Sequence, residues 1–160
     1  MSHRSSFSQH NSFSKCARMW YFAKVKKIPV VQDMCYADGG TSVHNTLEQY
    51  YSGKFSNIDE AKVFFKQEWE KFKLDKHKLF QYKFDEYWLM VLNGVKLGVS
   101  VTDTELKIYF SDCIGYLDIV NSNKDEIGDW KSSKRTEEKD IEYRKQGLVY
   151  AWLYVRKSNS

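Results

Sequence analysis

The stretch of sequence that decides the fold reads GYLDIVNSNKDEIGDWKSS and covers residues 115–133. It opens with an apolar run typical of a buried central strand, turns at NSNKD, and continues in a second strand-like run, EIGDWK. Asp118 lies in the first run, and Asp129 and Lys131 flank Trp130 in the second. Because burying a charge without a partner is costly, these groups either lie harmlessly at strand ends or are placed to bind something.

Asp129 and Lys131 are two residues apart, so on a strand both side chains point to one face of the sheet and Trp130 points to the other. The short turn brings Asp118 to the same end of the sheet. Two converging carboxylates repel each other unless a cation neutralises them, and oxygen ligands suit Mg²⁺ or Mn²⁺. A lysine beside them can orient or deprotonate an attacking water, or stabilise charge on a phosphate. An ordinary charged surface hairpin is the alternative interpretation of these three residues.

The residues around the hairpin predict a mixed fold, α/β (α+β), in a single domain over residues 1–160. Capping residues and apolar residues at helical spacing predict helices, and alternating apolar residues predict strands. The predicted elements, in chain order, are a short helix capped by Ser12 or Ser14, a helix from about Thr41 to Gly53, a helix capped by Asn57, a helix over 84–99, a three-stranded meander over 104–110, 113–120 and 126–131, and a closing helix over 137–155.

Composition narrows the class of protein. The chain has 160 residues, enough for one sizeable core, and it is rich in aromatic residues, with 5 Trp, 11 Tyr and 10 Phe. A net charge of +4 is compatible with nucleic-acid binding without requiring it. Cys16, Cys35 and Cys113 lie far apart, which suggests neither a zinc ribbon nor a disulfide framework. The polar start and the lack of a long apolar run predict a soluble, cytoplasmic protein with no membrane segment.

Two helical pairs add polar side chains to those of the hairpin. His44 and Glu48 are four residues apart and share a helix face, although a lone histidine is as well explained by capping or by the core. Gln146 and Tyr150 share a face of the closing helix and suit phosphate or base contacts, or a plain protein interface. The opposite face of that helix is predicted to be the core-directed stripe, formed by Ile141, Leu148, Trp152 and Val155.

Four short sequence patterns follow one another along this chain. They are G-x-x-x-H at residues 40–44, G-x-x-D at 115–118, D-x-K at 129–131 and Q-x-x-x-Y at 146–150. In this order they resemble the RecB-like exonuclease branch of the PD-(D/E)XK nuclease superfamily, which includes CRISPR-associated and phage recombination exonucleases. The segment SFSQHNSFSKCARMWYF also resembles the opening segment of that branch. The resemblance implies a restriction-endonuclease-like core.

The resemblance also implies a role for each matching residue. His44, Asp118 and Asp129 would bind Mg²⁺ or Mn²⁺ with help from the Trp130 carbonyl, and Asp118, Asp129 and Lys131 would form the catalytic set. Gln146 and Tyr150 would hold the DNA strand or orient the catalytic groups. Apart from the resemblance, helix geometry alone makes Glu48 an expected partner of His44, and Ser132 and Ser133 follow the lysine on a loop expected to touch phosphate. Members of the branch with a [4Fe–4S] cluster bind it with four cysteines. This chain has only Cys16 at a comparable place, so no iron–sulfur cluster is expected.

The sequence therefore predicts a metal-dependent deoxyribonuclease, expected to be an exonuclease that acts on single-stranded DNA or duplex ends in recombination, repair or replication. A small phage-like enzyme fits this description. The chain ends soon after Tyr150, where the branch usually continues, which suggests a minimal nuclease or one that needs a protein partner or a second copy. The alternatives are a catalytically inactive nucleic-acid-binding or assembly subunit of the same fold, and a structural domain with coincidental motifs.

Overall fold

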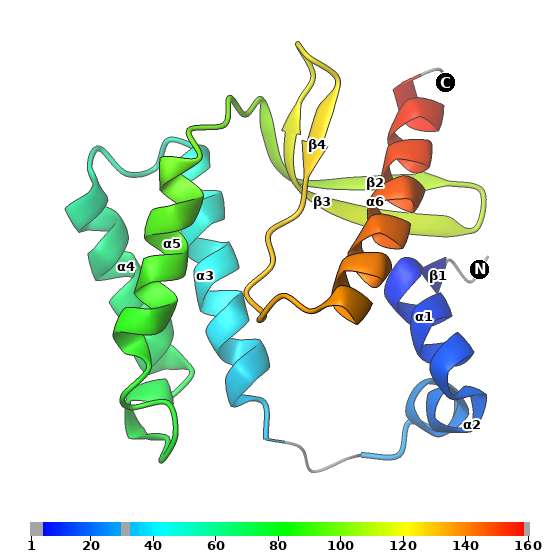
Figure 1. Cartoon of the computed structure of the whole chain (residues 1–160), viewed down its shortest axis with the longest axis horizontal. Helices are drawn as coiled ribbons and strands as arrows, with labels where there is room; N and C mark the ends of the chain where they lie inside the picture. The colour runs from blue at the N-terminus through cyan, green and yellow to red at the C-terminus, as the bar shows by residue number, and fades with distance from the viewer. Residues whose placement is uncertain (1–4, 30–32, 159–160) are drawn as a thin grey trace. The chain divides into compact units, whose positions relative to one another are not determined.

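Strand β3 (Cys113–Asn121) is the central strand of a four-stranded mixed sheet, as its apolar run predicts. The computed structural model describes residues 5–29 and 33–158, and within them the chain is a mixed α+β protein (Figure 1). In chain order the other elements are β1 (Ser5–Ser6), α1 (Phe7–Lys15), α2 (Ala17–Trp20), the π-helical turn η1 (Tyr21–Val25), α3 (Cys35–Tyr51), α4 (Ile58–Lys71), the 3₁₀ turn η2 (Leu74–Lys76), α5 (Phe84–Lys96), β2 (Asp103–Phe110), β4 (Glu126–Gly128) and α6 (Glu137–Ser158).

The chain divides into two compact units. The first is made of the described residues within 1–32, 107–117 and 135–160, and the second of those within 33–106 and 118–134. Strands β2 and β3 each contribute residues to both units. The single domain expected from the sequence stays a prediction. No helix in the part of the chain that the structure describes is long and apolar enough to cross a membrane.

The sheet contains the predicted meander and one further strand. Strand β3 pairs with β2 and, through its last residues, with antiparallel β4 in the register Ile119↔Gly128. The added strand, β1, runs parallel to the start of β3, with Ser5 opposite Cys113. Sequence patterns did not indicate β1, because two serines carry neither apolar alternation nor β-branched side chains.

Strand β4 ends at Gly128, so the D-x-K residues follow the strand and are not part of it. The prediction of a strand through residue 131 is wrong here. The indole of Trp130 stacks on the ring of Tyr51, with ring centroids 5.8 Å apart and planes inclined by 18°. Trp130 thus packs against the helical core of the second unit.

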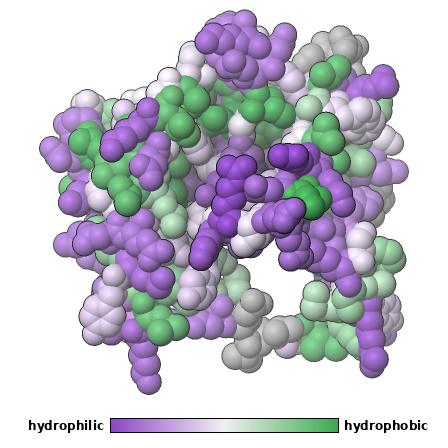
Figure 2. Space-filling view, viewed as in Figure 1, coloured by the Kyte–Doolittle hydropathy of each residue, from purple (hydrophilic) through white to green (hydrophobic). Residues whose placement is uncertain are grey.

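Helices α3, α4 and α5 lie side by side and enclose the main core of the second unit (Figure 1). Phe65 and Trp69 of α4 and Val91 of α5 are almost completely buried there. Burying an aliphatic or phenyl side chain of this size stabilises the fold by roughly 1.5–3 kcal/mol. The face of this bundle seen in Figure 2 carries both hydrophilic and hydrophobic side chains. Val63 of α4 and Leu89 of α5 are among the exposed hydrophobic residues of the bundle.

The helix boundaries in this unit agree with the sequence except at the start of α3 and at the end of α5, which stops at Lys96, three residues before the predicted end. The predicted cap of α4 is confirmed, because the Asn57 side chain accepts a 3.0 Å hydrogen bond from the Glu60 N–H. The stop of α3 is also confirmed, with Gly53 at φ +75° just beyond it. However, α3 begins at Cys35, six residues before the predicted start. Gly39 and Gly40, which suggested a break, lie inside the helix.

In the first unit, Ser6 caps α1 by accepting a hydrogen bond from the Gln9 N–H, so the predicted cap at Ser12 or Ser14 is wrong. The closing helix α6 is confirmed, but its buried face differs from the predicted one. Leu153 is fully buried, whereas the predicted core stripe is exposed at Ile141, Leu148, Trp152 and Val155. Both faces of α6 carry apolar residues, so periodicity alone does not decide between them.

Candidate active site

His44 and the glycine of the G-x-x-x-H pattern, Gly40, both lie in helix α3, one helical turn apart. A Cβ atom on Gly40 would lie 2.5 Å from the Ser132 Oγ, closer than real Cβ contacts allow. The glycine therefore leaves room for the Ser132 side chain of the D-x-K loop against α3. Ser132, predicted to touch phosphate, is placed by the structure against this helix, one turn from His44.

Asp118 connects three parts of the second unit. It lies on β3 and is only 9% exposed. Its Oδ2 lies 3.3 Å from the His44 Nδ1 on helix α3, and the same oxygen accepts a hydrogen bond from the backbone N–H of Trp130. The carboxylate therefore joins the strand, the histidine helix and the D-x-K loop. This confirms the proximity of Asp118 to the D-x-K residues that the hairpin predicted.

Asp129 and Lys131 form an ion pair, and both side chains are about one-quarter to one-third exposed. They meet although they do not lie on a strand, so the expected proximity holds and its expected cause does not. Burial raises the pKa of Asp129, the hydrogen bond from Lys131 opposes that rise, and the charge of Asp118 adds to it. The lysine thus compensates part of the cost of placing two aspartates close together.

His44 lies in a strongly anionic environment. Burial of its imidazole acts to lower its pKa, but the hydrogen bond and charge of Asp118, with the charges of Asp129 and Glu105, outweigh burial and raise the pKa overall. The side chain is 28% exposed. The carboxylates around His44 therefore favour the protonated form of its imidazole more than solvent would.

Glu105 is a site residue that sequence reasoning missed. One ligand atom of its side chain lies within 4.8 Å of ligand atoms of both His44 and Asp118. Partial burial of its carboxyl and then the charges of Asp118 and Glu48 raise the pKa of Glu105. The alternating pattern of TELKIYF placed Glu105 on the polar face of β2. Its backbone has φ +48°, a left-handed conformation that is unusual for a residue other than glycine within a strand.

Two of the other predicted residues lie in the second unit. Glu48 follows His44 by one helical turn, and its charge acts on Glu105. Among the described residues His44 pairs with Asp118, and no hydrogen bond joins it to Glu48. Ser133 lies in the irregular segment after β4, next to Ser132.

Gln146 and Tyr150 belong to helix α6 of the first unit and contact each other. The Gln146 Nε2 donates a 2.9 Å hydrogen bond to the Tyr150 hydroxyl, as expected for residues one turn apart. The Tyr150 ring lies on Gly115 of β3, where an added Cβ would be 3.1 Å from the nearest ring carbon. The glycine of the G-x-x-D pattern therefore makes room for the tyrosine of the Q-x-x-x-Y pattern.

The donor set of the second unit fits a divalent cation. His44, Glu105 and Asp118 each offer one ligand atom, and these atoms lie within 4.8 Å of one another. The pKa values of Glu105 and Asp129 are both raised, first by burial and also by the charge of Asp118. A hard cation with several oxygen ligands would relieve that repulsion. A lysine paired to one of the carboxylates stands beside this group.

Carboxylates and a histidine that can hold a divalent cation, with a lysine beside them, are groups that can support metal-assisted hydrolysis. A family model of the PD-(D/E)XK nuclease superfamily matches residues 4–160, and the chain belongs to that superfamily. No curated protein and no solved structure matches the chain. Membership indicates a metal-dependent nuclease with a nucleic-acid substrate, on a restriction-endonuclease-like fold.

Proposed function

We propose that this chain is a deoxyribonuclease of the RecB-like branch, an exonuclease that uses Mg²⁺ or Mn²⁺ and works in recombination, repair or replication. The observation that carries the proposal is the contact of His44 with Asp118 beside the Asp129–Lys131 ion pair. These residues come from three of the four sequence patterns of that branch. The fourth pattern supplies the Gln146–Tyr150 pair on α6.

In this proposal His44, Asp118 and Asp129 hold the cation together with the Trp130 carbonyl, and Glu105 is a further candidate ligand. The bound cation would supply a nucleophilic water and neutralise charge on the scissile phosphate. Asp118 is held in position without the cation, by the Trp130 N–H and by His44. A site fixed in this way loses little free energy to reorganisation when the cation binds.

Lys131 is proposed to act on the attacking water or on the phosphate, because its ammonium stands at Asp129. Gln146 and Tyr150 are proposed to hold the DNA strand or to orient the catalytic groups, and Ser133 to contact phosphate. Ser132 is proposed to combine a phosphate contact with its packing against Gly40. We further propose that the two units act as one nuclease domain, alone or with a protein partner or second copy.

The test is cleavage of end-labelled single-stranded and duplex DNA in Mg²⁺, Mn²⁺, Ca²⁺ or EDTA, with closed circles and RNA of the same sequence as comparisons. We expect linear DNA to be shortened from its ends in Mg²⁺ or Mn²⁺, with circles and RNA left intact. Asp129→Asn should abolish cleavage, whereas Asp125→Asn makes the same chemical change in the turn of the same hairpin and should not.

Each departure from this result has a defined meaning. Full activity in excess EDTA would exclude the metal role, and cutting of closed circles would show an endonuclease. DNA binding by a well-folded chain without cleavage under any of these cations would indicate the catalytically inactive subunit instead. Activity retained by Asp129→Asn would remove that residue from the proposed ligand set.

A further inference from the structure

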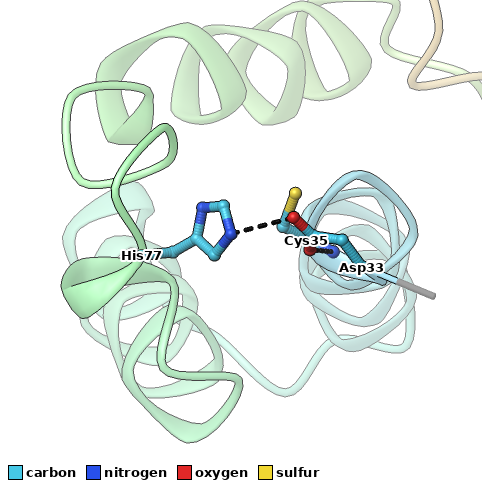
Figure 3. A group of neighbouring side chains, drawn as sticks. All are labelled: Asp33, Cys35 and His77. Carbon is cyan, nitrogen blue, oxygen red and sulfur yellow. Dashed lines mark hydrogen bonds and ion pairs between the residues drawn. The ribbon is translucent and has the colours of Figure 1, made fainter. Parts of the chain in front are cut away.

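A second group of metal-ligand side chains lies in the second unit, among residues that the nuclease patterns do not include. Asp33 lies two residues before Cys35, the first residue of helix α3, and His77 directly follows the turn η2. Figure 3 shows the three side chains turned toward one another from these two segments. The His77 Nε2 lies 3.0 Å from the Asp33 Oδ2, and one ligand atom from each residue lies within 4.8 Å of the others.

Local contacts already hold the three donors in place. The Asp33 Oδ1 accepts a 3.0 Å hydrogen bond from the Cys35 N–H, which fixes the carboxylate at the start of α3. The His77 ring packs edge-on against Phe80, with ring centroids 5.8 Å apart. Cys35 is buried, with 4% of its surface exposed. These contacts order the donors before any cation arrives.

The spacing of the donors is close to what tetrahedral zinc requires. Zn–N and Zn–O bonds of about 2.0–2.1 Å and a Zn–S bond of about 2.3 Å place neighbouring donors roughly 3.3–3.6 Å apart. The His77–Asp33 pair, at 3.0 Å, needs to open by only a few tenths of an ångström. The sulfur, within 4.8 Å of both, needs to approach by at most roughly 1.5 Å.

We propose that Asp33, Cys35 and His77 form a zinc site, separate from the nuclease centre, that fastens the start of helix α3 to the segment after η2. A thiolate, an imidazole and a carboxylate suit Zn²⁺, whereas Mg²⁺ and Mn²⁺ prefer the oxygen donors of the nuclease site. Three protein ligands leave a fourth position for water. The site opens into a cavity of about 330 Å³ that Asp38 also lines.

The charged groups around the proposed zinc site can neutralise the cation, and the proton displaced by binding is accounted for. Thiolate and Asp33 neutralise the two charges of the cation, and Asp38 adds a negative charge against the lysines Lys73 and Lys76 that line the same cavity. Binding releases the thiol proton of Cys35 to solvent. When Zn²⁺ binds the His77 Nε2, the neutral imidazole carries its proton on Nδ1. Nδ1 then no longer accepts the long 3.3 Å hydrogen bond from the Leu79 N–H.

Such a site would support the nuclease centre without taking part in the reaction. Helix α3 carries Gly40 and His44, so fixing its first turn limits the motion of the helix that presents the histidine. The expected effect on the fold is an increase in Tm. With zinc at about a hundred times its Kd, linkage predicts an increase on the order of 5–10 °C for a chain of this size.

The experiment uses Co²⁺ as the probe, because only a thiolate ligand gives Co²⁺ an intense near-ultraviolet charge-transfer band. The nuclease centre has no cysteine, so it is silent in this measurement. We expect the metal-free full chain to develop the band, to saturate at one equivalent, and to lose the band when Zn²⁺ is added. Cys35→Ser should abolish the band, and Cys113→Ser and Cys16→Ser, the matched controls, should keep it.

His77→Gln and Asp33→Asn, on more exposed positions, provide variants that need not disturb the core, and each should weaken Co²⁺ binding at least about tenfold. Asp118→Asn, in the nuclease centre, should leave the band unchanged. The proposal is refuted if no band forms, if it persists in Cys35→Ser, or if it fails to saturate at one equivalent. Loss of the band in either control cysteine variant refutes it as well, since another thiol would then be the ligand.

Discussion

Replacing Asp118 by asparagine keeps the shape of the side chain and removes the charge that His44 senses most directly. The His44 Nδ1 and Asp118 Oδ2 are 3.3 Å apart. At that distance two unit charges interact with about 1.3 kcal/mol at the dielectric constant of water, and about 5 kcal/mol at an effective value of 20. His44 is 28% exposed and Asp118 nearly buried, so the interaction lies between these limits.

One pKa unit corresponds to about 1.36 kcal/mol, so the weaker limit alone predicts that the pKa of His44 falls by about one unit. Burial then acts against the charged imidazole with less opposition, so the pKa of His44 should be lower in the variant than in the parent protein. Asparagine can still accept the hydrogen bond from the Trp130 N–H. The geometry of the loop should therefore survive the change.

The assay is an NMR titration of the histidine ring signals in the metal-free chain, with His10 and His77 as internal controls. Both controls should titrate as in the parent protein. A His44 pKa that stays within about 0.3 units of the parent value would refute the reasoning, because the predicted change exceeds that by a factor of about three. A rise in the pKa of His44 would refute it too.

Three other predictions test the site from different directions. Lys131→Met should slow single-turnover DNA cleavage by about a hundredfold or more, as for other transition-state charge contacts, with little change in DNA affinity in Ca²⁺. Lys124→Met, on the turn of the same hairpin, is the control. If Lys131→Met binds DNA poorly yet cleaves it normally, Lys131 is a phosphate anchor. Glu105→Gln should weaken activating Mg²⁺ roughly 10- to 100-fold in a metal titration of cleavage if Glu105 is a ligand or supports one; an unchanged Mg²⁺ requirement would leave it a bystander. The pKa values of His44, Glu105 and Asp129 are all raised, so the metal-free folded state binds more protons than the unfolded chain. This contribution to stability is present at low pH and is lost as pH rises through the folded pKa values. The increase in Tm on adding Mg²⁺ should therefore be larger at pH 8 than at pH 5, and an equal increase at both would contradict the linkage.

The sequence predicts the elements of the fold well where local signals and packing agree. The cap at Asn57, the stop at Gly53 and the apolar run of β3 each have a local physical cause, and each is confirmed. The start of α3 could not be predicted in the same way. Gly39 and Gly40 read as helix breakers, but both lie where other side chains approach the helix backbone closely.

The arrangement of the candidate site could likewise be predicted only where its residues are close in the sequence. Spacing along one hairpin brings Asp118 near Asp129 and Lys131, so their proximity could be anticipated without the structure. The path of the D-x-K loop depends on Trp130 stacking on Tyr51, a contact between residues 79 positions apart that no local pattern contains. Glu105 was missed because alternation places it on a polar face, while its left-handed backbone conformation is visible only in three dimensions.

The two glycines of the sequence patterns show how short motifs encode tertiary contacts. Gly40 stands one turn before the histidine, and it admits Ser132, the residue after the D-x-K pattern. Gly115 stands three residues before Asp118, and it admits the ring of Tyr150 from the Q-x-x-x-Y pattern. In each pair, the glycine of one pattern makes room for a side chain within or next to another pattern. A side chain at either position would crowd its neighbour, because an added Cβ would lie 2.5 Å from the Ser132 Oγ at Gly40 and 3.1 Å from the Tyr150 ring at Gly115. The four patterns therefore act as two packed pairs, Gly40 with Ser132 in the second unit and Gly115 with Tyr150 in the first.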